Sequence, residues 1–169
     1  MKSHFIRLFN YDQFANQIIF KAILDGGLPH RALTLLAHLL AVSQVWLLRS
    51  EGESSHGVEL WPEVTAGNGL GPDAETAENQ VRVSSMEEAI GNNHRAWVKF
   101  LEKETDFDRT VSYSNQSGTS HYQNRLSDVL SQVLNHGTHH RAQIGQVLKS
   151  AGVEQLPLTD YIVYLRLKR

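Results

Sequence analysis

LSDVLSQVLNHGTHHRAQIGQVLKSAG, residues 126–152, is a long stretch with a single helical pattern. Its apolar residues recur at steps of three and four, which is typical of the buried face of an α-helix, and Gly152 supplies a stop. We expect this helix to run from about residue 123 to residue 151. One apolar face over that length predicts packing against other long helices.

Three histidines lie within five positions of this stretch: His136, His139 and His140. Because each helical residue turns about 100°, His140 lies about 40° from His136 on the apolar face, whereas His139 points about 60° to the other side. The i, i+4 spacing of His136 and His140 lets two imidazoles on one face reach one ion. Two ligands do not complete a site, and a histidine on an apolar face is often a core residue hydrogen-bonded to a carbonyl group.

A third ligand should come from a facing helix. The best placed is His38, because it lies on the apolar face of a helix expected over residues 29–50. His94 is the rival, in a helix expected over 84–105 that begins at a capping box formed by Ser84 and Glu87. The other histidines lie at ends or in loops and are expected to be solvated: His4, His30, His56 and His121.

The rest of the chain completes a helical pattern. A further helix is expected over 4–24, and the short connection that follows it predicts that the first two helices are antiparallel neighbours. Residues 51–83 lack a sustained period and form a long loop, in which only Trp61-Pro62 is expected to pack down. Residues 110–122 suit a small hairpin or ordered loop, with a turn at Gly118.

The last segment, YIVYLRLKR, follows Thr159-Asp160, which can cap a short helix. We therefore predict an all-α fold: a four-helix bundle with a long loop between helices two and three, a small hairpin or loop before helix four, and a short C-terminal helix. At 169 residues the chain is expected to form a single domain, 1–169.

Composition excludes several classes of function. The chain is 41% apolar and 20% charged with a formal charge of −2, so no general positive field favours nucleic acid. It contains no cysteine, which excludes disulfides, thiolate ligands and a cysteine nucleophile. The first residues lack the continuous apolar core of a signal peptide, and we expect no membrane span, because no uninterrupted apolar run is long enough to cross a bilayer. A cytoplasmic protein that binds neither nucleic acid nor membrane is expected.

In its sequence motifs the chain resembles the DinB / YfiT-like family of metal-dependent proteins, which is distinct from the similarly named DNA polymerase. The similarity covers nearly the full length, and its most specific part is the H-x-x-x-H-R-x-Q pattern that starts at His136. The other matching stretches are YDQFANQ, LLAHLLAVSQVWLLRSEG, the WP of the long loop, the segment around Gly118, and LPLTDYIVYLR.

The resemblance implies a divalent metal bound by His38, His136 and His140, and a homodimer. It favours zinc or nickel, with iron or manganese as alternatives. Some relatives are thiol S-transferases or thiol-dependent isomerases that use bacillithiol, mycothiol or glutathione, so an external thiol cofactor and a small-molecule substrate are expected. This chain departs from the usual pattern at Ala142, where relatives have glycine, and at Gln132, where many have another histidine.

The sequence assigns no catalytic residue. Three imidazoles leave coordination positions open, as in catalytic zinc sites. A zinc protease is disfavoured because its motif places glutamate after the first histidine, where this chain has Gly137. The speculative supporting residues are Asp160, Tyr122, Asn135 and His139, each of which also suits a cap or a surface position. Arg141 is expected to form a structural ion pair at a helix or dimer contact.

Three functional hypotheses remain at this stage. The first is a metal-dependent enzyme with an S-transferase or isomerase activity on a small molecule. The second is a metal-containing binding or stress-response module without turnover, and the third is a metal-free bundle in which the histidines have no role. An open coordination position favours the enzyme, whereas a fourth protein ligand or an apolar seal favours the binding module.

Overall fold

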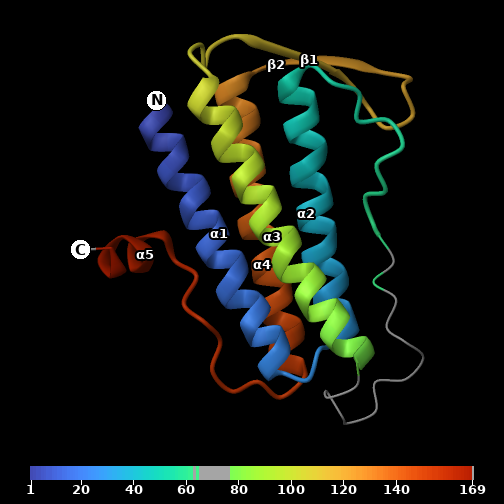
Figure 1. Ribbon diagram of the computed structural model, residues 1–169, viewed down its shortest axis with the longest axis vertical. Coiled ribbons are helices and arrows are strands. Elements are labelled where there is room, and N and C mark those ends of the chain that lie inside the picture. The colour runs from blue at the N-terminus through green and yellow to red at the C-terminus, as the bar shows by residue number, and fades with distance from the viewer. Residues whose placement is uncertain (63, 65–76, 169) are drawn as a thin grey trace.

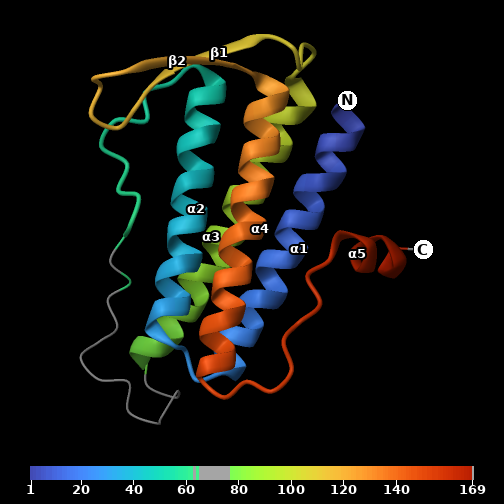
Figure 2. The ribbon, with the colours of Figure 1, turned by 180° about the vertical axis from the view of Figure 1, so that it is seen from behind.

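The computed structural model describes residues 1–62, 64 and 77–168. In this part of the chain, four long helices lie alongside one another and a two-stranded hairpin crosses one end (Figures 1 and 2). The helices are α1 (Lys2–Asp25), α2 (His30–Glu51), α3 (Ala77–Lys103), α4 (Leu126–Ser150) and the short α5 (Tyr161–Leu167). The strands are β1 (Thr110–Ser114) and β2 (His121–Arg125). The predicted helical fold is confirmed.

The four long helices are not arranged in sequence order around the bundle. α1 and α4 run in one direction and α2 and α3 in the other, and the main helix pairs are α2 with α4 and α1 with α3. α1 and α2 are antiparallel, but they lie diagonally opposite and contact each other little, so the prediction that they are neighbours was wrong. The reason is the length of the connection, because four extended residues span about 13 Å, which is enough to cross the bundle diagonally.

The beginning of α3 differs from the prediction. The helix starts at Ala77, so Ser84 and Glu87 lie inside it and do not form a capping box at its start. The residues before Ser84, AENQVRV, contain good helix formers, and these allow the helix to continue upstream. The predicted loop is shorter as a result, and its residues 63 and 65–76 lie outside the described part of the chain.

The hairpin also shortens a predicted helix. Residues 121–125 pair with 110–114 in an antiparallel register that sets Tyr113 opposite Tyr122, so α4 begins at Leu126 and not at 123. Gly118, in the turn, has a φ of 71°, which glycine adopts without strain. α5 follows Asp160, whose side chain makes no capping bond within the described residues. α5 is held instead by Tyr164, which packs against α1.

In the described residues, the core has two large apolar parts with a polar layer between them, besides the small cluster under α5. One part, near the connection of α1 and α2, includes Ile23, Leu36, Ile144 and Leu148. The other, near the hairpin, includes Trp97, Leu101, Leu126 and Leu130. Buried polar residues lie between these parts along α1, α2 and α4: Asp12, Asn16, Ser43, His140 and Arg141. Since buried polar groups need partners, this middle layer is where a functional site is expected.

α2 is the one helix in the described residues that is long and apolar enough to cross a membrane by length and composition. However, 61% of the apolar window is buried inside the structure. The core helix of a bundle passes the same test, because it too is apolar over most of its surface.

Candidate metal centre

Three imidazoles from two facing helices meet in the middle of the bundle. His38 comes from α2, and His136 and His140 come from successive turns of α4. Each ring offers one nitrogen, and these three nitrogens lie within 4.8 Å of one another. His38 and His140 are buried, and His136 is partly buried. The packing of α2 against α4 therefore joins residues about a hundred positions apart in the chain.

The outer nitrogens of two rings are already engaged. The Nδ1–H of His38 donates to the carbonyl oxygen of Leu60 at 2.6 Å, and the Nδ1–H of His140 donates to Oε1 of Gln143 at 2.8 Å. A neutral imidazole has one N–H, so each bond leaves a lone pair on Nε2. Bonds of this kind fix the tautomer and the ring orientation of metal-binding histidines in proteins.

The environment keeps the pair on α4 neutral. Nε2 of His136 lies 3.1 Å from Nε2 of His140, and because His140 has no proton there, His136 is the donor. Burial, followed by the neighbouring histidines His140, His38 and His139, lowers the pKa of His136 to about 4. Burial also lowers the pKa of His140. Both imidazoles are consequently uncharged near pH 7, as a metal ligand must be.

The donor set fits a divalent ion. Tetrahedral zinc with Zn–N bonds of 2.0–2.1 Å holds its nitrogen ligands about 3.3 Å apart. The 3.1 Å separation of the two Nε2 atoms on α4 is close to that value, and the 4.8 Å limit for the whole group leaves an adjustment that side-chain rotation can supply. The three-histidine group is therefore able to hold a metal ion, with zinc and nickel among the metals that imidazole suits.

Gln143 was not assigned a role from the sequence. Its Oε1 accepts from His140, and its Nε2 donates to Nε2 of His139 at 3.1 Å. His139 is exposed and stays outside the three-histidine group, as the helical wheel predicted, but it touches this group through the Gln143 amide and through its ring, whose centroid lies 5.1 Å from that of His140. The signal that indicates Gln143 is its i+3 spacing from His140, which places the two side chains on one helix face.

The predicted structural ion pair of Arg141 is confirmed, and it lies between helices. Nη1 of Arg141 donates to Asp12 at 2.5 Å and to Asn16 at 2.8 Å, joining α4 to α1. We call the Asp12–Arg141 contact the α1–α4 ion pair. A Cβ atom on Gly137 would lie 2.9 Å from Asp12 and 3.0 Å from Arg141, so the glycine that follows His136 makes room for the pair. This pair therefore holds α4, the helix that carries His136 and His140, against α1.

The rival ligand His94 belongs to a different contact. Its Nε2–H donates to Oδ1 of Asn10 on α1 at 2.7 Å, and it is not part of the three-histidine group. Burial lowers its pKa. The bond to Asn10 accounts for a histidine on an otherwise apolar face without any metal.

The other three speculative supporting residues, Asp160, Tyr122 and Asn135, are not part of the three-histidine group. Asp160 precedes α5, Asn135 is exposed on α4, and Tyr122 is half-exposed on β2, where it stacks on Tyr113. His136 lies ten residues beyond Leu126, the first residue of α4, or about 15 Å along the helix, which separates Tyr122 from the site. The two departures from the family pattern, Ala142 and Gln132, are both exposed to solvent. Neither contributes to the core around the histidines.

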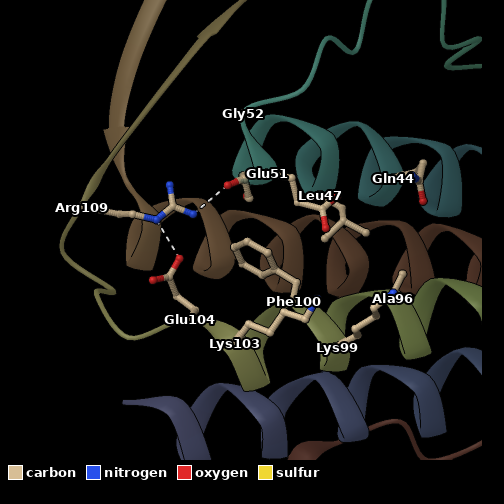
Figure 3. Close-up of a pocket in the computed structure, with 11 residues that line it drawn as sticks. Gln44, Leu47, Glu51, Gly52, Ala96, Lys99, Phe100, Lys103, Glu104 and Arg109 are labelled. Atoms are coloured by element: carbon tan, nitrogen blue, oxygen red, sulfur yellow. Dashed lines mark hydrogen bonds and ion pairs between the residues drawn. The ribbon is translucent and has the colours of Figure 1, made fainter.

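A separate cleft of about 610 Å³ lies between α2 and α3 near the hairpin (Figure 3). Leu47 and Phe100 contribute apolar surface, and Lys99 lies on its α3 side. Arg109 at one end is held by Glu104 and by the carbonyl oxygen of Ser50, both at 2.7 Å. Leu47 follows His38 by nine residues, which is about 180° around α2. The cleft and the histidines are thus on opposite sides of that helix.

Comparison with known proteins identifies the family of this chain. A family model described as the DinB family matches residues 1–168. The chain belongs to the DinB family. It is 28% identical over 178 residues to Protein DinB of Bacillus subtilis (strain 168), an alignment that covers 98% of this chain and 95% of that protein. No solved structure was found to match.

Membership of the DinB family and the three-histidine group are independent observations. The family match spans all the described helices, and the group follows from how α2 and α4 pack. Both are compatible with a metal site in the middle of the bundle. Neither one identifies a reaction, because a fold can carry many functions.

Proposed function

We propose that this DinB-family chain is a metal-dependent enzyme whose divalent ion is held by His38, His136 and His140. The observation that carries the proposal is the convergence of three ring nitrogens within 4.8 Å, two of them on rings whose outer nitrogens are already bound. Such an arrangement is typical of a metal site whose ligands are oriented before the ion arrives. We propose zinc or nickel as the ion, with iron or manganese as alternatives.

The donor set also supports an enzyme more than a closed structural site. Among the described residues, no fourth histidine, cysteine, aspartate or glutamate joins the group. When bound, an ion held by three neutral imidazoles supplies a Lewis acid that activates a thiol or a water molecule in an open position. The protein's own residues bind the ion, fix the tautomers of His38 and His140 through Leu60 and Gln143, and keep His136 and His140 uncharged through burial.

We propose a thiol-dependent transfer or isomerisation of a small molecule as the reaction. The support is the family resemblance, since some relatives are thiol S-transferases or thiol-dependent isomerases. Because the chain has no cysteine, a thiol used at this site has to come from a second molecule. We further propose a cytoplasmic homodimer that binds neither nucleic acid nor membrane. Light scattering after gel filtration tests the dimer, which has twice the chain mass of 19.0 kDa.

The decisive experiment measures metal content first and turnover second. Protein purified without nickel resin is analysed for metals, as wild type and as His136→Ala, with His94→Ala as the matched control because His94 is a half-buried histidine outside the group. We expect about one ion per chain in the wild type and the control and a loss of most of it in His136→Ala. Equal metal content in all three proteins would refute the site.

Metal-loaded protein is then given bacillithiol, mycothiol or glutathione with a panel of small electrophiles and isomerisable substrates. Thiol consumption or isomerisation that depends on His136 supports the enzyme. Stable metal loading without turnover on the whole panel would instead indicate the non-catalytic binding module.

A further inference from the structure

The segment that follows α2 turns back along this helix and contacts it at two histidines. His38 donates to the carbonyl oxygen of Leu60, and eight residues earlier the ring nitrogen Nε2 of His30 lies 3.2 Å from the carbonyl oxygen of Val64. Between these two contacts lies Trp61, whose backbone N–H donates to Glu59 at 3.0 Å. The segment is thus fastened to α2 beside the three-histidine group.

Trp61 lies flat on one of the imidazoles. Its ring is parallel to that of His38, with an interplanar angle of 8° and a centroid separation of 3.6 Å, and it meets His140 at 85° and 6.5 Å. Trp61 nevertheless keeps 47% of its surface exposed. A large aromatic residue outside the helical core gains little from burial, so its stacking on His38 is the contact that explains its position.

The two contacts fix different degrees of freedom of the same ring. The bond to Leu60 sets the tautomer of His38 and the direction of its Nε2 lone pair, whereas the stack restrains rotation of the ring plane. An imidazole that binds a cation becomes electron-poor, and it then stacks more favourably on an electron-rich indole. By linkage, a clamp that favours the metal-bound ring must also strengthen metal binding.

We propose that Leu60 and Trp61 form a clamp that positions His38 for a divalent ion, with Trp61 as a positioning residue. This inference rests on the proposed metal site. Contacts that orient metal ligands from behind are worth about 10–100-fold in metal affinity. We expect Trp61→Ala to weaken binding by about that factor and Trp61→Phe, which keeps a ring that can stack, to recover most of it.

The test titrates Ni²⁺ into metal-free protein and follows binding by calorimetry and by tryptophan fluorescence. Ni²⁺ quenches nearby indoles, and the chain has three tryptophans, of which Trp46 packs against Tyr113 near the hairpin and serves as the control. We expect wild type and Trp46→Phe to be quenched on binding. In Trp61→Phe the quenching should be largely lost although the ion still binds.

Each outcome separates the clamp from the metal site itself. If wild-type protein binds no Ni²⁺, the proposed function is refuted, and the clamp is refuted with it. If wild type binds Ni²⁺ but Trp61→Ala binds it equally well, the clamp is refuted while the metal site stands. If Trp61→Phe binds as weakly as Trp61→Ala, stacking is not the cause. Circular dichroism of each variant excludes unfolding, which is not expected for a half-exposed residue outside the helices.

Discussion

Removal of the Asp12 carboxylate should destabilise the protein strongly. Arg141 is 3% exposed, and its guanidinium donates to Asp12, Asn16 and Thr138. In Asp12→Ala the guanidinium stays in the core with only neutral acceptors. Leaving a buried charge without its partner costs about 3–5 kcal/mol. That is a large share of the 5–15 kcal/mol by which folded domains are usually stable.

Urea unfolding of metal-free protein, followed by circular dichroism, measures this loss. For a chain of this size it corresponds to a fall in the melting temperature of roughly 6–20 °C. Asp25→Ala is the matched control, because Asp25 is also an aspartate on α1 that pairs with a cation, but the Lys21–Asp25 pair is exposed to solvent. Exposed pairs contribute about 0–1 kcal/mol, so this control should unfold nearly as the wild type does.

The comparison of these two variants decides whether the α1–α4 ion pair is structural. If Asp12→Ala loses less than about 1 kcal/mol, the guanidinium is not a buried charge that depends on Asp12, and the argument fails. Replacement of both members by apolar residues of similar size should recover most of the stability, because no charge is then left unpaired. The recovery would distinguish loss of pairing from loss of packing.

Three other expectations follow. Gly137→Ala should destabilise the protein in urea unfolding although alanine favours helices, because its Cβ would press on the α1–α4 ion pair. The control Gly91→Ala meets only the end of an exposed arginine and should stabilise the protein by about 0.5–1 kcal/mol. Metal-free protein should lose stability as the pH falls from 6.5 towards 4, because folding lowers the pKa of His136 to about 4, so the unfolded chain binds the proton first. In a pH series, the melting temperature should fall less steeply with pH for His136→Gln than for the wild type, and equal slopes would contradict this. Ser43→Ala should cost about 1–3 kcal/mol in the same unfolding assay, because it leaves the buried Trp97 N–H without its acceptor, and in Trp97→Phe the added Ser43→Ala change should cost less.

Most of the helices can be predicted from the sequence, because an amphipathic helix depends on the spacing of apolar residues within a few positions. Apolar residues that recur every three or four positions predict the ends of α1, α2 and α4 to within a few residues. The start of α3 was missed because a capping box is a local match that helix-forming residues upstream can override. The diagonal arrangement of α1 and α2 was missed because a short connection limits distance but does not select a neighbour.

The residues of the candidate site could likewise be predicted only in part from the sequence. The pairing of His136 with His140 follows from one turn of one helix, so the sequence is sufficient to predict that they face the same direction. His38 was preferred to His94 on the sequence, but both lie on apolar helix faces, and only the packing of α2 against α4 brings one of them to the pair. Asn10, which engages His94, comes from a third helix and carries no signal in the sequence near His94.

What the sequence determined by itself is the set of helices and the i, i+4 imidazole pair, since backbone hydrogen bonds and side-chain spacing act within a few residues. Tertiary structure decided which groups surround that pair: His38 across the bundle, the carbonyl oxygen of Leu60 behind it, and Asp12 against Arg141. Such contacts join residues far apart in the chain. These contacts depend on how whole helix faces pack, and leaving any of the buried polar groups without its partner would be costly.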